Sequence, residues 1–229
     1  MSIDLAAIRA ARTAIADVAK HTPVVSSVTL SEEIGGRIVF KAESLQRTGA
    51  FKIRGAMNKL ASLGDRARTG VVTGSAGNHA QALALAARHF DVPCEIVVPR
   101  GAPVTKIEAC RGYGAVVVEH GAALKEAVDE ALARADATGM TFCPPFDDPA
   151  VVAGQGTLGI ELVEDAATKQ SYPSRERIGM KVAMEARNHG VLLRPLGDVM
   201  ILMPPFIITP EEIDKLLEVT YQCIESITQ

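Results

Sequence analysis

The chain has 229 residues, of which 48% are hydrophobic and 22% charged, with a formal net charge of −3. This is the composition of an ordinary globular protein with room for one large or two modest domains. A near-neutral balance gives no electrostatic reason to expect nucleic acid or an anionic membrane as a partner, and no apolar run is long enough to cross a bilayer.

The N-terminus predicts an amphipathic helix rather than a signal peptide. Asp4 comes early, and apolar residues then recur at helical spacing (Leu5, Ile8, Ile15 and Val18). The cysteines lie far apart without C-x-x-C spacing, which predicts reduced, buried thiols in a cytoplasmic protein and no metal site (Cys94, Cys110, Cys143 and Cys223).

The first two thirds of the chain alternate strand and helix patterns. The expected strands are 37–42, 70–74, 94–99 and 115–120, and the expected helices are 52–63, 78–90, 102–114 and 121–136. Apolar, β-branched strands that alternate with helices indicate βαβ crossovers. The sequence therefore predicts an α/β domain with a parallel sheet covered on both faces.

The last third of the chain no longer shows this regular alternation of strand and helix patterns. A helix over 175–189 precedes "VLLRPLGDVMILMPP", which reads as two short strands around a Leu-Gly-Asp turn. A final helix begins with Thr209 as N-cap, Pro210 at the first helical position and Glu212 completing a capping box. We expect a small α+β unit with short antiparallel strands.

Two motifs could carry chemistry. In "TGAFKIRGA" (48–56), Lys52 stands at the start of a helix, although a single lysine there is most often solvated. In "TGSAGNHAQA" (73–82), a strand ends in a glycine turn that opens directly into a helix. Such a turn can bind an anion through free N–H groups and the helix dipole, or can be a tight connection and nothing more.

Together the two motifs resemble the second structural family (fold type II) of pyridoxal phosphate enzymes, which includes the threonine and serine dehydratases. The resemblance covers about residues 5–157 and includes "VVPRGAPVTKIEACRGYGAVVV" and "DDPAVVAGQGT". It implies pyridoxal phosphate as cofactor and a small hydroxy-amino acid as substrate. The implied reaction is an ammonia-lyase β-elimination that yields a 2-oxo acid and ammonia.

The resemblance also implies roles for individual residues. Lys52 would bond covalently to the cofactor and move the substrate Cα proton, which a lysine with a lowered pKa can do. Phe51 would pack beside the pyridine ring, and Asn78 would bind its 3-hydroxyl group. The 75–79 turn would hold the substrate carboxylate (Ser75, Ala76, Gly77, Asn78 and His79).

Ala76 separates two activities within the resembled family. Serine racemase has a serine at this position, where the hydroxyl acts as the base on the opposite face of the substrate. An alanine side chain cannot exchange a proton. The sequence therefore favours a dehydratase over a racemase.

One expected feature is absent from the sequence. In the resembled family a run of glycines well after the "GQGT" stretch holds the cofactor phosphate through charge-assisted hydrogen bonds. The only Gly-Gly pair here is Gly35–Gly36, near the N-terminus. We therefore expect weakened cofactor binding, and a catalytically silent protein stays an alternative.

Residues 158–229 resemble a different family, the C-terminal end of the class III aminotransferases, and most of all the biotin-pathway diaminopelargonate enzyme. The resemblance implies that Arg194 contacts the carboxylate of the amino-acceptor substrate. The chain thus reads as a chimera of a dehydratase-like domain, 1–157, and an aminotransferase-like small domain, 158–229. A fragment of the biotin-pathway aminotransferase is the third alternative.

The stretch "AGQGTLGIELVED" (153–165) lies where the two resemblances meet. Its apolar residues fit either a helix or a strand, and we predict a strand over 158–163 because the two tail strands need a third partner. We also predict a homodimer. In the dehydratase family the segment before residue 50 packs against a second half that is missing here, which would leave apolar faces uncovered.

Overall fold

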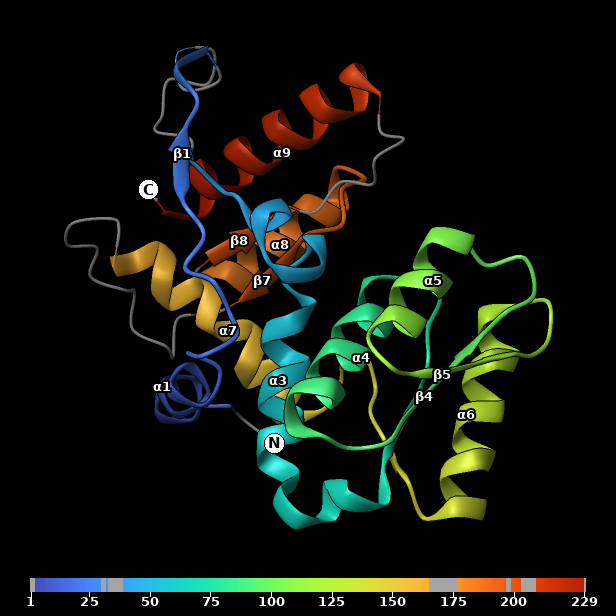
Figure 1. The fold of residues 1–229 in the computed structure, drawn as a ribbon. Helices are drawn as coiled ribbons and strands as arrows, with labels where there is room; N and C mark the ends of the chain where they lie inside the picture. The colour runs from blue at the N-terminus through green and yellow to red at the C-terminus, as the bar shows by residue number, and fades with distance from the viewer. Residues whose placement is uncertain are drawn as a thin grey trace. The chain divides into compact units, whose positions relative to one another are not determined.

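The computed structural model describes residues 3–29, 32, 39–164, 177–196, 199–202 and 209–228. The chain divides into two compact units. The first unit comprises Met1–Pro23 with Lys41–Leu158, and the second comprises Val24–Phe40 with Gly159–Gln229. Each is described by itself below, and Figure 1 shows the elements of both.

A parallel sheet forms the centre of the first unit. Its strands stand in the order β5-β4-β3-β6, and each neighbouring pair is parallel. Their bounds are Val71–Gly74 for β3, Cys94–Val98 for β4, Val116–Glu119 for β5 and Thr141–Phe142 for β6. The predicted α/β class with a parallel sheet is confirmed; β6, only two residues long, was not predicted.

Helices cover both faces of this sheet. They are α3 (Lys52–Leu63), α4 (Asn78–Phe90), α5 (Val104–Gly112) and α6 (Leu124–Thr138). Alternate side chains of the strands face opposite ways. Val72 and Val97 pack with Ala127 and Ala131 of α6, on one face.

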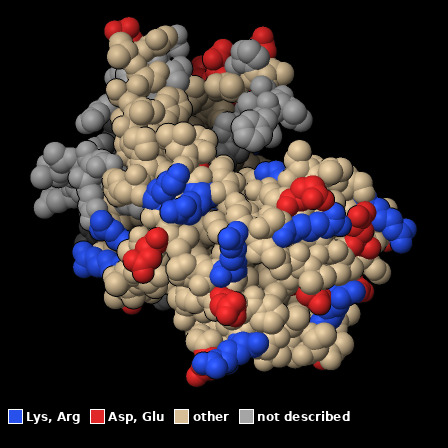
Figure 2. Space-filling view, viewed as in Figure 1, with Lys and Arg blue, Asp and Glu red and all other residues tan. Residues whose placement is uncertain are grey.

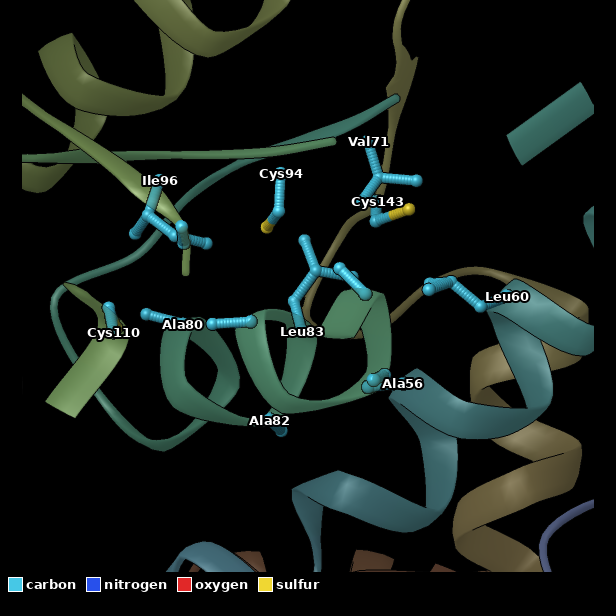
Figure 3. Close-up of a cluster of buried hydrophobic side chains, with 14 of the residues drawn as sticks. Ala56, Leu60, Val71, Ala80, Ala82, Leu83, Cys94, Ile96, Cys110 and Cys143 are labelled. Atoms are coloured by element: carbon cyan, nitrogen blue, oxygen red, sulfur yellow. The ribbon is translucent and has the colours of Figure 1, made fainter. Parts of the chain in front are cut away.

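The other face of the sheet carries the largest core. Val71 and Ile96 of the sheet pack there with residues of α3 and α4, among them Leu60 and Leu83. Figure 3 shows Leu83 of α4 pointing toward the strands, with Cys94 and Cys143 near it and Cys110 farther along, beside Ala80. All four cysteines of the chain are buried and free, as predicted.

Shorter elements complete the first unit. The predicted N-terminal helix is α1 (Leu5–Ala14), whose N-cap Asp4 accepts a hydrogen bond from the Ala7 amide. Three 3₁₀ helices precede β3 in the chain. They are η1 (Glu43–Leu45), η2 (Arg47–Gly49) and η3 (Gly64–Thr69). The helices predicted over 52–63 and 78–90 have those bounds in the structure.

The strand predicted over 158–163 is wrong. Helix α7 runs without interruption over Pro149–Glu164. Its first turn is capped by Asp148, which accepts from the Ala150 amide at 2.9 Å, and its Thr157 hydroxyl donates to the Gly154 carbonyl at 2.7 Å. Residues 151–157 also contact α3, through Gly154 and through the Thr157 hydroxyl, and this tertiary packing selects the helical period from a sequence that fits both.

The second unit contains a small core between two helices. Helix α8 (Ile178–Asn188) and helix α9 (Pro210–Thr228) bury Val182, Ala186, Val219 and Cys223 together. Strands β7 (Arg194–Leu196) and β8 (Val199–Ile201) pair antiparallel, as predicted. The predicted turn residues 197–198 lie outside the described residues.

The remaining predicted features of this part have mixed outcomes. The capping box is confirmed, since the Thr209 amide donates to Glu212 and the Glu212 amide donates back to the Thr209 hydroxyl. Strands β1 (Val24–Ser26) and β2 (Val39–Lys41) form a two-stranded sheet. Residues 37–38 of the predicted strand 37–42 lie outside the described residues. Among those that are described, no helix is both long and apolar enough to span a membrane.

Candidate active site

The candidate site lies at the carboxyl ends of β3 and β6. The chain leaves β3 into the turn 75–77, from which α4 starts, and it leaves β6 into residues 143–145. The sheet order places β4 on one side of β3 and β6 on the other, so the direction of strand succession reverses here. Open α/β sheets bind ligands outside the carboxyl ends of strands at such a reversal.

Lys52 reaches this edge from the helix that precedes β3, and its contact there is with a segment far away in sequence. It is the first residue of α3, and its Nζ donates to the carbonyl of Pro145 at 2.9 Å. The Phe51 ring centroid lies 5.1 Å from the same nitrogen. The amine is therefore held at the sheet edge by a neutral carbonyl and an aromatic ring, and sequence reasoning missed the Pro145 contact, which spans 93 residues of chain.

His79 belongs to the interior behind this edge. Its side chain is 3% exposed, and Nε2 lies 3.0 Å from the Cys143 carbonyl, to which it donates. The pKa of His79 is lowered from 6.5 to about 4, mainly by burial; the Cys143 hydrogen bond acts in the raising direction, and the positive charge of nearby Lys52 adds a smaller lowering effect. The imidazole is thus neutral near pH 7.

The 75–79 turn is anchored at its start and exposed at Asn78. The Ser75 amide donates to the Val97 carbonyl at 3.0 Å, and the Gly77 amide donates to the Ser75 hydroxyl at 3.4 Å. Ala76 packs partly against the core. Asn78 is exposed, and its Oδ1 accepts from Lys106 Nζ at 2.9 Å. Lys106 comes from α5, and nothing in the sequence singled it out.

The residues present fit the amine-binding and ring-binding parts of pyridoxal phosphate. Lys52 offers a primary amine, Asn78 offers an exposed amide, and no atom stands within 4 Å of a Cβ built on Gly77. Among the described residues four buried polar side-chain atoms lack a hydrogen-bond partner, and three lie in the two motifs (Thr48, Thr73 and His79, the fourth being Gln155). Gly35 and Gly36 lie outside the described residues.

A buried ionic cluster around Arg54 links α3 to neighbouring segments of the chain. Arg54 is fully buried, and its guanidinium donates to both carboxylate oxygens of Glu43, at 2.9 and 2.8 Å. The same group donates to the Thr157 hydroxyl on α7 at 3.3 Å and to the Lys20 carbonyl at 3.2 Å. Two-point pairing fixes both position and orientation, so the cluster ties the helix that bears Lys52 to α7 and to the N-terminal segment.

The two helices also touch through their glycines. A Cβ on Gly154 would lie 2.4 Å from the Arg54 carbonyl, and one on Gly55 would lie 2.9 Å from the Val151 carbonyl. The Asn58 side chain donates to the Ala150 carbonyl at 2.7 Å, and Lys59 pairs with Asp148. Helix α3 thus packs backbone to backbone against α7, which explains Gly154 of "AGQGT"; a Cβ on Gly156 would instead meet the Ile8 side chain, at 3.1 Å.

Arg194, the residue implied by the tail resemblance, opens β7 in the second unit. Its side chain lies outside what the structure describes. Over the viewed face of the molecule, Lys and Arg side chains stand next to Asp and Glu side chains (Figure 2), in keeping with the near-neutral net charge.

The model of a protein family described as "Pyridoxal-phosphate dependent enzyme" matches residues 15–173. The chain belongs to this family. The match includes both motifs and the whole of α7. Pyridoxal phosphate is therefore the cofactor of the family to which the candidate site belongs.

Individual relatives agree with this membership. The chain is 49% identical to the L-threonine ammonia-lyase of Thermotoga maritima over 164 residues, which cover 71% of this chain and 41% of that protein. The chain therefore spans less than half of this relative's length.

Solved structures of the family show the same fold. The serine racemase of Dictyostelium discoideum aligns with a TM-score of 0.70 at 34% identity, over 85% of this chain and 66% of that one. Isoform 2 of the threonine deaminase of Solanum lycopersicum, in its processed form, aligns with a TM-score of 0.66 at 37% identity, over 72% and 47%.

Proposed function

We propose that the protein binds pyridoxal phosphate at Lys52 and removes water and then ammonia from a small β-hydroxy-amino acid, as an ammonia-lyase. The observation that carries this proposal is the Lys52 amine, held 2.9 Å from the Pro145 carbonyl at the edge where β3 and β6 end. Family membership over residues 15–173 and the identity to a threonine ammonia-lyase support it.

Each residue of the site has a part in this proposal. The Lys52 amine would hold the cofactor covalently and, once the amino group of the substrate has replaced it there, would accept the proton from the substrate Cα. Asn78 donates to the ring hydroxyl oxygen, and the N–H groups of the 75–79 turn, at the start of α4, receive the substrate carboxylate. Bound pyridoxal phosphate supplies an electron-withdrawing ring that stabilises the charge left on Cα.

Ala76 supports elimination over racemisation. Its methyl group packs partly against the core and carries no proton that could be exchanged. Names of similar proteins include both threonine and serine enzymes, so we propose the β-hydroxy-amino acids as the substrate class.

A cofactor titration tests the proposal. We expect an absorbance band of lysine-bound cofactor when wild type is titrated with pyridoxal phosphate, and no such band with Lys52→Ala. Lys125→Ala is the matched control, because Lys125 is paired with Asp129 on the exposed side of α6. A band that persists in Lys52→Ala, or wild type without any band, would contradict the proposal. Release of 2-oxo acid from threonine or serine then distinguishes a catalytically active protein from one that binds the cofactor without turnover.

We further propose that the region after residue 157 derives from an aminotransferase-like small domain. The division of the chain between Leu158 and Gly159 supports this boundary, and so does the order helix, antiparallel strand pair, helix in the second unit. Helix α7 continues past this boundary to Glu164, and the family match continues past it to residue 173. A transamination assay with the biotin-pathway keto-amine should be blank, and turnover there would favour the aminotransferase alternative.

A further inference from the structure

The Asn78 amide is held by a cation from a neighbouring helix. Asn78 opens α4, and Lys106 lies in the first turn of α5, where its backbone amide donates to the Pro103 carbonyl at 2.9 Å. The next residue, Ile107, is buried in the main core. The stem of Lys106 therefore starts from a fixed backbone, and its Nζ reaches Asn78 Oδ1 at 2.9 Å.

This contact decides which way the amide points. The two ends of an asparagine amide have nearly the same shape, but one accepts and the other donates hydrogen bonds. An ammonium group can only donate, so it selects the Oδ1 end. With Oδ1 facing Lys106, the Nδ2 end turns away from Lys106 with its donors free for an acceptor.

We propose that Lys106 is a positioning residue for the cofactor: it orients the Asn78 amide so that Nδ2 donates to the ring hydroxyl oxygen of pyridoxal phosphate. This inference rests on the proposed function. Without Lys106 the exposed amide of Asn78 rotates between both orientations. In one of them Oδ1 faces the ring hydroxyl oxygen, so that two acceptors meet and no hydrogen bond forms.

A double-mutant cycle on the affinity for pyridoxal phosphate tests the inference. We expect Lys106→Met to weaken binding about fivefold in the wild-type background, the size of one lost hydrogen bond. In an Asn78→Ala background the same substitution should change the affinity less than about twofold, because Lys106 acts through Asn78. Lys125→Met controls for the loss of one positive charge. Equal weakening in both backgrounds, or none in either, would overturn the inference.

A second measurement needs no cofactor. In a ¹H–¹⁵N spectrum of the protein without cofactor, the side-chain amide signals of Asn78, identified by their loss in Asn78→Ala, should move in Lys106→Met and stay in place in Lys125→Met. Unmoved signals would overturn the inference even where Lys52 binds the cofactor. A protein whose Asn78 signals move but which fails to bind cofactor would instead overturn the proposed function, and with it the cofactor-facing role of Lys106.

Discussion

His79 illustrates how a single side chain can belong to a functional motif and still be part of the interior. The resemblance implies that the turn containing His79 meets the substrate, but its imidazole is buried and donates to the Cys143 carbonyl. Lys52 donates to the carbonyl of Pro145, two residues further along the same segment. The two side chains therefore fix the position of residues 143–145, and a neutral His79 places no positive charge beside half-buried Lys52.

The depressed pKa of His79 predicts a loss of stability in mild acid. Unfolded chains bind a proton at His79 below pH 6.5, whereas the folded protein excludes it until about pH 4. The free energy of unfolding should therefore be unaffected above pH 6.5 and fall by about 3 kcal/mol as the pH drops through that window. Urea unfolding at pH 7 and pH 4.5 measures this fall.

The matched variants are His79→Gln, which keeps a neutral donor, and His89→Gln on the exposed end of α4. His79→Gln should flatten the pH dependence between pH 6.5 and 4, and His89→Gln should leave it as in wild type. An unchanged slope in His79→Gln would assign the acid sensitivity to other groups.

At the scale of elements, the crossing of α3 and α7 determines where Lys52 stands. Backbone contact at Gly55 and Gly154 brings the helices close, and the Arg54–Glu43 cluster with Thr157 fixes their rotation. A shift of α3 would move the first residue of that helix, Lys52, with respect to the Pro145 carbonyl. The packing of α7 is thus part of the site although α7 supplies none of the proposed catalytic groups.

Gly154→Ala tests this crossing. The new methyl group would stand 2.4 Å from the Arg54 carbonyl, so the helices must move apart, and we expect a loss of about 2 kcal/mol in the free energy of unfolding. Gly112→Ala is the control, since Gly112 ends α5 with no atom within 4 Å of a built Cβ. This control should be neutral or more stable by about 0.5 kcal/mol. Equal stabilities of the two variants in urea would contradict the close crossing.

Sequence patterns predicted the elements whose periodicity is unambiguous. The bounds of α3 and α4 were predicted to the residue, because Gly64 and the 75–77 turn delimit strongly patterned segments. Residues 158–163 fit two periods equally, and the helix forms because residues 151–157 before them pack on α3, a contact that no local pattern reveals. Strand β6 is too short to produce an alternation.

The candidate site was predictable only in part. Lys52 and the 75–79 turn stand in recognisable motifs, but their neighbours come from backbone carbonyls and from other helices. The Pro145 carbonyl carries no side-chain signal, and Lys106 is one of many lysines in the chain. Local patterns indicate which residues can react, whereas tertiary contacts decide what they face.

For the whole molecule, exposed apolar side chains around β1 and β2 predict self-association. Val25, Val28, Val39 and Phe40 are all exposed in the second unit, and clustered apolar surface of this kind usually lies in interfaces. Light scattering should give twice the chain mass of 24.2 kDa. Val28→Asp with Phe40→Asp should give monomer, whereas Val104→Asp, at an exposed apolar residue of α5, should not. A wild-type monomer would contradict the dimer.

Because Arg54 and Thr157 lie far apart in sequence, their contact can form only late in the synthesis of the chain. Lys52 leaves the ribosome early, but the carbonyl and the helix that hold it are made about 100 residues later, at Pro145 and Thr157. Contacts so distant in sequence are slow to form. A nascent chain that stops before residue 145 therefore carries Lys52 without the contacts that hold it, and we predict that capture of pyridoxal phosphate begins only once α7 has emerged.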